Sequence, residues 1–190
     1  MLFELVKKNR SFRRFDESFE IEYDILKNLV ELARLTPSSV NWQPLRFALV
    51  NDREINAQIF ENLAWAGLLK EWKGPEAGER PSAYVVILTD TAVAKNMKTD
   101  VGIVAQTMML GAAEKGLGGC MIGSVNRENV ARILGIDTER YAIDLVLALG
   151  KPAETVKIVD VPENGSTNYF RDENDVHCVP KRSVEDLIIG

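Results

Sequence analysis

The sequence is poor in the residues that carry metal or nucleophilic chemistry. It has one histidine, His177, and two cysteines, Cys120 and Cys178, which lie far apart. A single imidazole cannot serve a zinc site that needs several, nor a triad that needs a spare base, so we expect no metal site. We expect Cys120 in the core, because its neighbours are apolar, and His177 at the surface or at an interface. If the protein is an enzyme, its chemistry should therefore come from a cofactor.

Long apolar runs are also missing. No uncharged stretch approaches the ~20 residues that cross a bilayer, and acids and bases appear too early for a signal peptide. The 190 residues carry a net charge of −5, which argues weakly against a nucleic-acid binder. We expect a single domain over residues 1–190 and, by default, a cytoplasmic protein.

Hydrophobic periodicity and capping residues predict alternating helices and strands. The predicted helices cover residues 2–8, 22–35, 53–65, 99–115 and 126–134. The predicted strands cover residues 45–50, 84–88, 118–123 and 143–149. Helix 99–115 is apolar around most of its circumference and should be central, and small residues such as Gly111 should let another element approach closely. Expected caps are Asp52, Asn126, Gly116 and Gly135.

The last forty residues show little periodicity. Such a tail is long for a self-contained chain, and tails of this kind often wrap a partner subunit. The pattern therefore suggests an obligate dimer.

A basic segment lies near the amino terminus of this acidic protein. Five cations, with no acid among them, occupy residues 7–14: Lys7, Lys8, Arg10, Arg13 and Arg14. Guanidinium groups offer paired donors that match two phosphate oxygens, and Ser11 adds a hydroxyl. The alternative is a solvated basic face.

Two further segments could bind a ligand. The loop 37–44 is stiffened by two prolines and presents polar side chains around Trp42, which suits a planar ligand with polar edges. In Gly116–Ser124, glycines flank a predicted strand and would let backbone N–H groups approach a ligand. This is neither a dinucleotide fingerprint nor a phosphate loop. An ordinary helix-to-strand connection would explain the loop 37–44 equally well. Helix capping and tight packing would explain the glycines of Gly116–Ser124 about as well.

Taken in order, five segments resemble the nitroreductase family of FMN-dependent flavoproteins. They are residues 10–15 (RSFRRF), 37–44 (PSSVNWQP), 100–123 (DVGIVAQTMMLGAAEKGLGGCMIG), 148–154 (ALGKPAE) and 179–182 (VPKR). Each segment alone is weak, but together they span nearly the whole chain.

The resemblance implies an α+β, three-layer α-β-α fold with a central, mostly antiparallel sheet. It implies an intertwined homodimer in which the carboxy-terminal extension wraps the partner and FMN lies at the interface. Residues implied to hold the FMN phosphate and ring edge are Arg10, Ser11, Arg13, Lys181 and Arg182. Residues implied to flank the ring are Pro37, Ser38, Ser39 and Asn41 of the partner subunit, with Ile122, Gly123 and Ser124. The Gly123 N–H is the implied donor to flavin N5.

The implied activity is transfer of hydride from NAD(P)H, by way of flavin N5, to a small acceptor such as a nitroaromatic, quinone or enone. This ping-pong cycle needs no protein acid or base. Asn9, Leu45 and the short stretch 64–82 depart from the family pattern, which puts the acceptor and the third wall of the pocket in question. The alternatives are a relative that uses FMN for flavin fragmentation, dehalogenation or azoline oxidation, and a non-catalytic binding protein.

Overall fold

The computed structural model describes residues 1–190 and confirms the expected α+β architecture. The helices are α1 (Leu2–Lys8), α2 (Tyr23–Arg34), α3 (Arg53–Phe60), α4 (Lys98–Glu114) and α5 (Arg127–Leu134). The strands of the main sheet are β1 (Phe15–Asp16), β2 (Leu45–Val50), β3 (Ala83–Asp90), β4 (Gly118–Ile122) and β5 (Tyr141–Pro152). No helix is long and apolar enough to cross a membrane.

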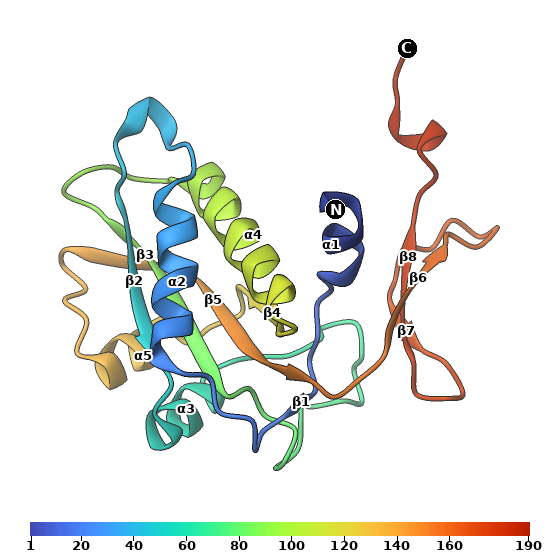
Figure 1. Cartoon of the computed structure of the whole chain (residues 1–190), viewed down its shortest axis with the longest axis horizontal. Helices are drawn as coiled ribbons and strands as arrows, with labels where there is room; N and C mark the ends of the chain where they lie inside the picture. Colours follow the sequence, from blue (N-terminus) through green and yellow to red (C-terminus); the bar gives the residue numbers. More distant parts are fainter.

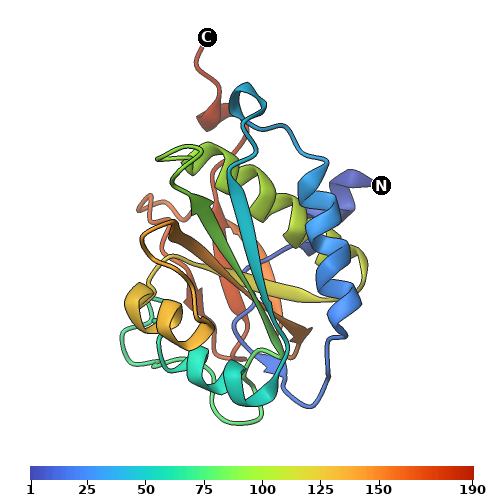
Figure 2. The same ribbon diagram turned by 90° about the vertical axis from the view of Figure 1, so that its left-hand side faces the viewer.

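The main sheet is antiparallel and forms the middle of three layers. Its order is β1-β5-β3-β2, with β4 also paired to β5. Alternate residues of β3 face opposite ways, so Val85 and Ile87 pack beneath α2 and α4, whereas Tyr84 and Val86 join the cluster beneath α3 and α5. Figure 2 shows α2 and α5 on opposite sides of the sheet. The expected three-layer arrangement is confirmed.

The caps confirm the local reading of the sequence. The Asp52 side chain accepts hydrogen bonds from two amides of α3, and Asn126 accepts one from Asn129 N. Gly135 closes α5 with a φ of 63°, in the left-handed region that favours glycine. Gly111 lets α2 approach α4, since a Cβ there would meet Leu32.

One helix is shorter than predicted. We expected α3 to run to residue 65, but it ends at Phe60. The following segment is held by the turn after β4, because Ala64 N donates to Ser124 O at 2.9 Å and Leu63 bridges Val125. Tertiary pairing overrides helix periodicity here.

The carboxy-terminal tail contains strands that periodicity did not predict. A three-stranded sheet combines β6 (Val156–Asp160), β8 (His177–Lys181) and β7 (Phe170–Arg171) in that order. We call residues 153–190 the arm. Figure 1 shows the arm running up one side of the molecule, away from the main sheet. Its strands give no clear alternation because side chains on both faces, such as Ile158 and Phe170, remain exposed.

Gly119 is a position in the main sheet where a side chain would collide with the backbone of the neighbouring strand. A Cβ there would collide with the carbonyl oxygen of Ala148. We expect Gly119→Ala to lower the free energy of unfolding by roughly 1–3 kcal/mol, as overpacking does. The matched control is Gly102→Ala, at an exposed site of α4 with open space around it. The control should leave stability unchanged or raise it by up to about 1 kcal/mol, as measured by urea denaturation.

Candidate functional site

The fold lays the basic segment along the glycine-flanked strand. Ser11 forms a parallel bridge with Gly119, and Phe12 N donates to Gly119 O at 2.9 Å. The Phe12 ring packs against Gly118, and a side chain at position 118 would collide with the ring. Because α1 ends at Lys8, residues 10–13 are not helical, so Arg10 and Arg13 do not share a helical face. The chain thus brings together two of the segments that the sequence singled out.

Arg10 and Arg13 are partly buried cations without acid partners. Neither forms an ion pair, whereas their neighbour Arg14 pairs with Glu79 and Asp175. Arg10 donates to Val6 O at 2.8 Å, and burial lowers its pKa. The Nε atoms of Arg10 and Arg13 have no hydrogen-bond partner. Uncompensated guanidinium groups beside a backbone edge suit an anion such as a phosphate.

The far end of β4 opens onto the surface. Ile122 is buried, whereas Gly123 and Ser124 are exposed, and a Cβ at Gly123 would meet only open space. Arg127 fixes this turn by donating to Gly123 O at 3.2 Å and to Ile143 O at 2.9 Å. A flat ligand could therefore approach the backbone at Gly123 without meeting a side chain there.

The loop 37–44 is anchored by a buried carboxylate. Ser38 and Ser39 donate their hydroxyls to Asp100 at 2.6 Å and 2.8 Å, and Ser39 N adds a third hydrogen bond. Burial of Asp100 would raise its pKa, but the hydrogen bonds from Ser38 and Ser39 together outweigh burial and lower it. Asp100 therefore stays ionised and holds the loop.

The same loop has an unusual backbone. Val40, Asn41 and Gln43 have φ values of 51°, 56° and 50°. A β-branched residue rarely adopts this region, and such strain clusters at functional sites. The Val40 side chain is 83% exposed and that of Trp42 is 53% exposed, so both are presented outward. Asn41 is exposed and accepts a hydrogen bond from Gln43.

Within one chain, the predicted site residues do not form a single cleft. Figure 1 shows the loop 37–44 at the top of the molecule, before β2, well separated from the segment that connects α1 to β1. Lys181 and Arg182 lie exposed at the end of β8. Lys181 is four residues beyond His177, about 13 Å along a strand.

His177 is buried, and the prediction of a surface or interface position is wrong. Its side chain is 1% exposed, because the arm folds back onto the basic segment of the same chain. His177 Nε2 lies 3.1 Å from the Arg13 guanidinium, and Tyr169 contacts both residues. Burial, together with Arg13, lowers the pKa of His177 to about 4. The imidazole is therefore neutral at pH 7 and can accept a hydrogen bond from Arg13. Cys120, by contrast, is buried in β4 as expected.

The lowered pKa of His177 predicts acid sensitivity. Between about pH 6.5 and pH 4 the unfolded chain takes up a proton on His177 that the folded chain does not, so stability falls as the pH drops through this window. The difference between the urea midpoints of the wild type and His177→Gln should be largest at pH 7 and should shrink as the pH falls toward 4. Since the carboxylates titrate equally in both proteins, a difference that does not change with pH would contradict a neutral, stabilising His177.

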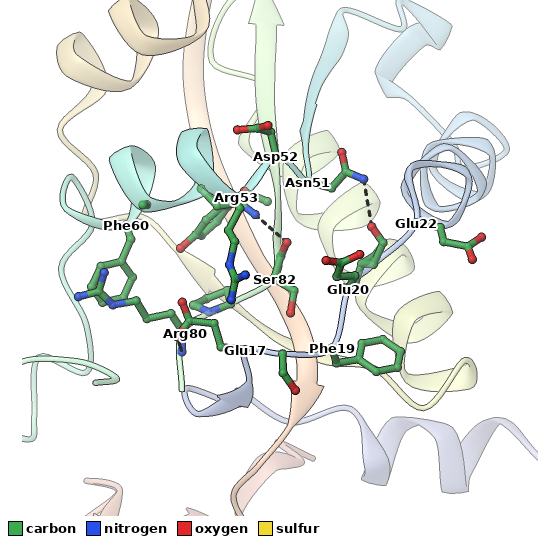
Figure 3. A pocket seen from close by; sticks show the side chains of 16 residues that line it. Glu17, Phe19, Glu20, Glu22, Asn51, Asp52, Arg53, Phe60, Arg80 and Ser82 are labelled. Carbon is green, nitrogen blue, oxygen red and sulfur yellow. Dashed lines mark hydrogen bonds between the residues drawn. The ribbon is translucent and has the colours of Figure 1, made fainter. Parts of the chain in front are cut away.

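Two surface hollows lie apart from the basic segment, and the second touches the loop 37–44. One, of about 310 Å³, is formed by α3 and the segments before α2 and β3, with Arg53, Arg80 and Glu17 among its lining residues (Figure 3). None of the predicted cofactor residues lines it. The other, of about 240 Å³, lies behind the loop 37–44 and includes Pro37, Ser38 and Asp100.

The fold is shared with a solved flavoprotein. A nitroreductase-type protein from Exiguobacterium sibiricum, solved in complex with FMN, matches with a TM-score of 0.68. It is 22% identical to this chain, and the match covers 86% of this chain and 94% of that one. The architecture described above is therefore the nitroreductase fold.

Sequence comparison shows the family directly. The model of the nitroreductase family matches residues 6–151, and the chain belongs to this family of enzymes. Among relatives, the Bacillus subtilis protein YdgI, a candidate NAD(P)H nitroreductase, is 27% identical over 184 residues, covering 80% of this chain and 88% of YdgI. The iodotyrosine deiodinase of Thermotoga neapolitana is also 27% identical, over 171 residues, covering 80% of this chain and 89% of that protein.

Proposed function

We propose that this protein is an FMN-dependent oxidoreductase that passes hydride from NAD(P)H to a small acceptor. The observation that carries the proposal is the bridge between Ser11 and Gly119. It places two arginines that form no ion pair beside the glycine-flanked strand. The residues fit the cofactor: Arg10 and Arg13 supply positive charge for its phosphate, and the open backbone at Gly123 leaves room for its ring. When bound, FMN would supply the hydride-carrying atom, N5.

The chain's own residues would bind and orient the cofactor. In this proposal Arg10, Ser11 and Arg13 hold the phosphate and ring edge, and Lys181 and Arg182 close over the phosphate. Ile122, Gly123 and Ser124 face the ring, with the Gly123 N–H directed at N5. A backbone N–H such as that of Gly123 can donate a hydrogen bond to N5 without any titratable side chain. This agrees with a site that has no free histidine for acid–base catalysis.

We propose that the functional unit is a homodimer in which residues 1–190 of each chain act together. The partner subunit would supply Pro37, Ser38, Ser39 and Asn41. Because the hydroxyl protons of Ser38 and Ser39 are used by Asp100, these residues would meet the ring through oxygen lone pairs or backbone groups. Apolar residues exposed on α1 and at the end of the arm support a partner: Leu2, Phe3, Leu187, Ile188 and Ile189. Strand β2 also has a free edge.

The test is the visible spectrum of the purified protein. We expect a yellow protein that carries or takes up FMN, and whose colour is bleached anaerobically by NADH or NADPH. Light scattering should give twice the mass of one chain. A colourless protein that takes up no FMN would contradict the proposal. We further propose a cytoplasmic location, where NAD(P)H is available; cell fractionation tests this.

The acceptor is the finer part of the proposal. We favour a nitroaromatic, quinone or enone, because a hydride acceptor of this kind needs no protein acid. The similarity to an iodotyrosine deiodinase makes reductive dehalogenation the second candidate. A panel of nitroaromatic, quinone, enone and iodinated phenol acceptors, each added to NAD(P)H-reduced protein, separates the two by the rate of flavin reoxidation.

A further inference from the structure

A single carboxylate ties together three segments that are distant in the sequence. Glu154 lies just after β5, where the arm leaves the main sheet, and its side chain is 3% exposed. Its Oε1 accepts hydrogen bonds from the backbone amides of Arg13 and Arg14, the second at 3.0 Å. Its Oε2 accepts a hydrogen bond from Arg171 of β7 at 2.6 Å. One side chain thus contacts the basic segment, the base of the arm and a strand of the arm.

The basic segment depends on this carboxylate for its conformation. The neighbouring amides of Phe12 and Phe15 donate to the carbonyl oxygens of Gly119 and Glu79, but those of Arg13 and Arg14 donate to no backbone carbonyl. A buried amide without a partner destabilises a structure by about 1–3 kcal/mol. Hydrogen bonds to a charged acceptor are also stronger than neutral ones. Without Glu154, the amides of Arg13 and Arg14 would lose their acceptor, and the segment would adopt another backbone conformation that satisfies them.

The arm depends on the same contact. Arg171, which is only 13% exposed, pairs with Glu154 and with Asp175, and Asp175 in turn pairs with Arg14. The Arg13 guanidinium lies 4.8 Å from the centre of the Tyr169 ring. Because Arg171 neutralises Glu154, Arg10 and Arg13 keep their positive charge available for an anion. Docking of the arm and ordering of the basic segment therefore require each other.

We propose that Glu154 is a positioning residue that couples FMN binding to docking of the arm. It touches no cofactor atom; it acts by fixing the backbone of Arg13 and Arg14 and by holding Arg171. This inference rests on the proposed function, since it takes the FMN phosphate to bind at Arg10 and Arg13. By thermodynamic reciprocity, a ligand that orders the basic segment must also stabilise the docked arm.

The test compares Glu154→Ala and Glu154→Gln with the wild type. FMN affinity is followed by quenching of flavin fluorescence, and docking of the arm by the rate at which trypsin cleaves it in the apoprotein. We expect Glu154→Ala to weaken FMN binding at least tenfold and to speed cleavage of the arm. In the wild type FMN should slow this cleavage, but in Glu154→Ala it should not. Glu163→Ala, at an exposed position of the arm, is the matched control and should behave as the wild type.

Glu154→Gln separates positioning from a general loss of structure. Its amide oxygen can still accept from the two backbone amides, but it cannot pair ionically with Arg171. We expect both the FMN affinity and the rate of arm cleavage to lie between those of the wild type and those of Glu154→Ala, because the two properties are coupled. If the wild type binds FMN and both variants bind it equally well, the inference is wrong and the proposed function stands. If the wild type itself binds no FMN, the proposed function fails.

Discussion

Replacing Arg10 and Arg13 together by alanine should weaken FMN binding about 100-fold or more. Each arginine is a partly buried cation with no acid partner, so its charge is available for a phosphate. Truncating one partner of a buried charge pair typically weakens binding by about 2–5 kcal/mol, and tenfold corresponds to 1.4 kcal/mol. Titration of the apoprotein with FMN, followed by fluorescence, measures the change.

The control for this variant removes the same number of positive charges from a different part of the surface. Arg53→Ala/Arg132→Ala removes two exposed arginines from α3 and α5, and neither arginine belongs to the predicted site. FMN affinity should then stay within a few-fold of the wild type, because distant surface charges are screened by salt. Equal weakening in both double variants would show that net charge, and not the basic segment, attracts the cofactor.

Mixing two defective variants should restore FMN sites if each site is built from two chains. One variant is Arg10→Ala/Arg13→Ala, and the other is Ser39→Ala/Asn41→Ala in the loop 37–44. In a mixed dimer one site receives the intact basic segment from one chain and the intact loop from the other. The second site of that dimer receives both defects. With random re-association about half of the dimers are mixed, so roughly a quarter of all sites should regain wild-type affinity.

Single-chain and two-chain sites give different results in this experiment. Each parent variant alone should show no tight sites, and the mixture should show them only after the subunits have been allowed to exchange. Stoichiometric FMN titration counts tight sites directly. If exchange is confirmed by mass spectrometry and no tight sites return, the loop and the basic segment do not meet across subunits.

Local signals predicted most of the main sheet and the helices that cover it. Asp52, Asn126 and Gly135 cap helices through contacts with residues only a few positions away, so a short window of sequence contains the information. The central helix, apolar on nearly every side, was recognisable because α4 packs against both α2 and the sheet. The short end of α3 was missed because residues from elsewhere in the chain decide it.

The parts of the site that escaped prediction are held by contacts between distant residues. Glu154 binds the amide of Arg13 across 141 residues, and His177 reaches Arg13 across 164. No local pattern distinguishes this histidine from a surface residue, and Glu154 was recognised only as the last residue of the family-like segment 148–154. Asp100 was recognised only as the first residue of a family-like segment, and its role as the anchor of Ser38 and Ser39 follows from the fold alone.

The exposed apolar side chains of the arm bear on the thermal stability of the protein. The side chains of Ile158 and Phe170 are nearly half exposed within the chain, and that of Ile189 is fully exposed. In a homodimer, association would cover such groups, and the law of mass action would then make the melting temperature depend on protein concentration. Thermal stability would thus depend on protein concentration as well as on the sequence. Dilution alone would favour dissociation of the dimer and so weaken cofactor binding.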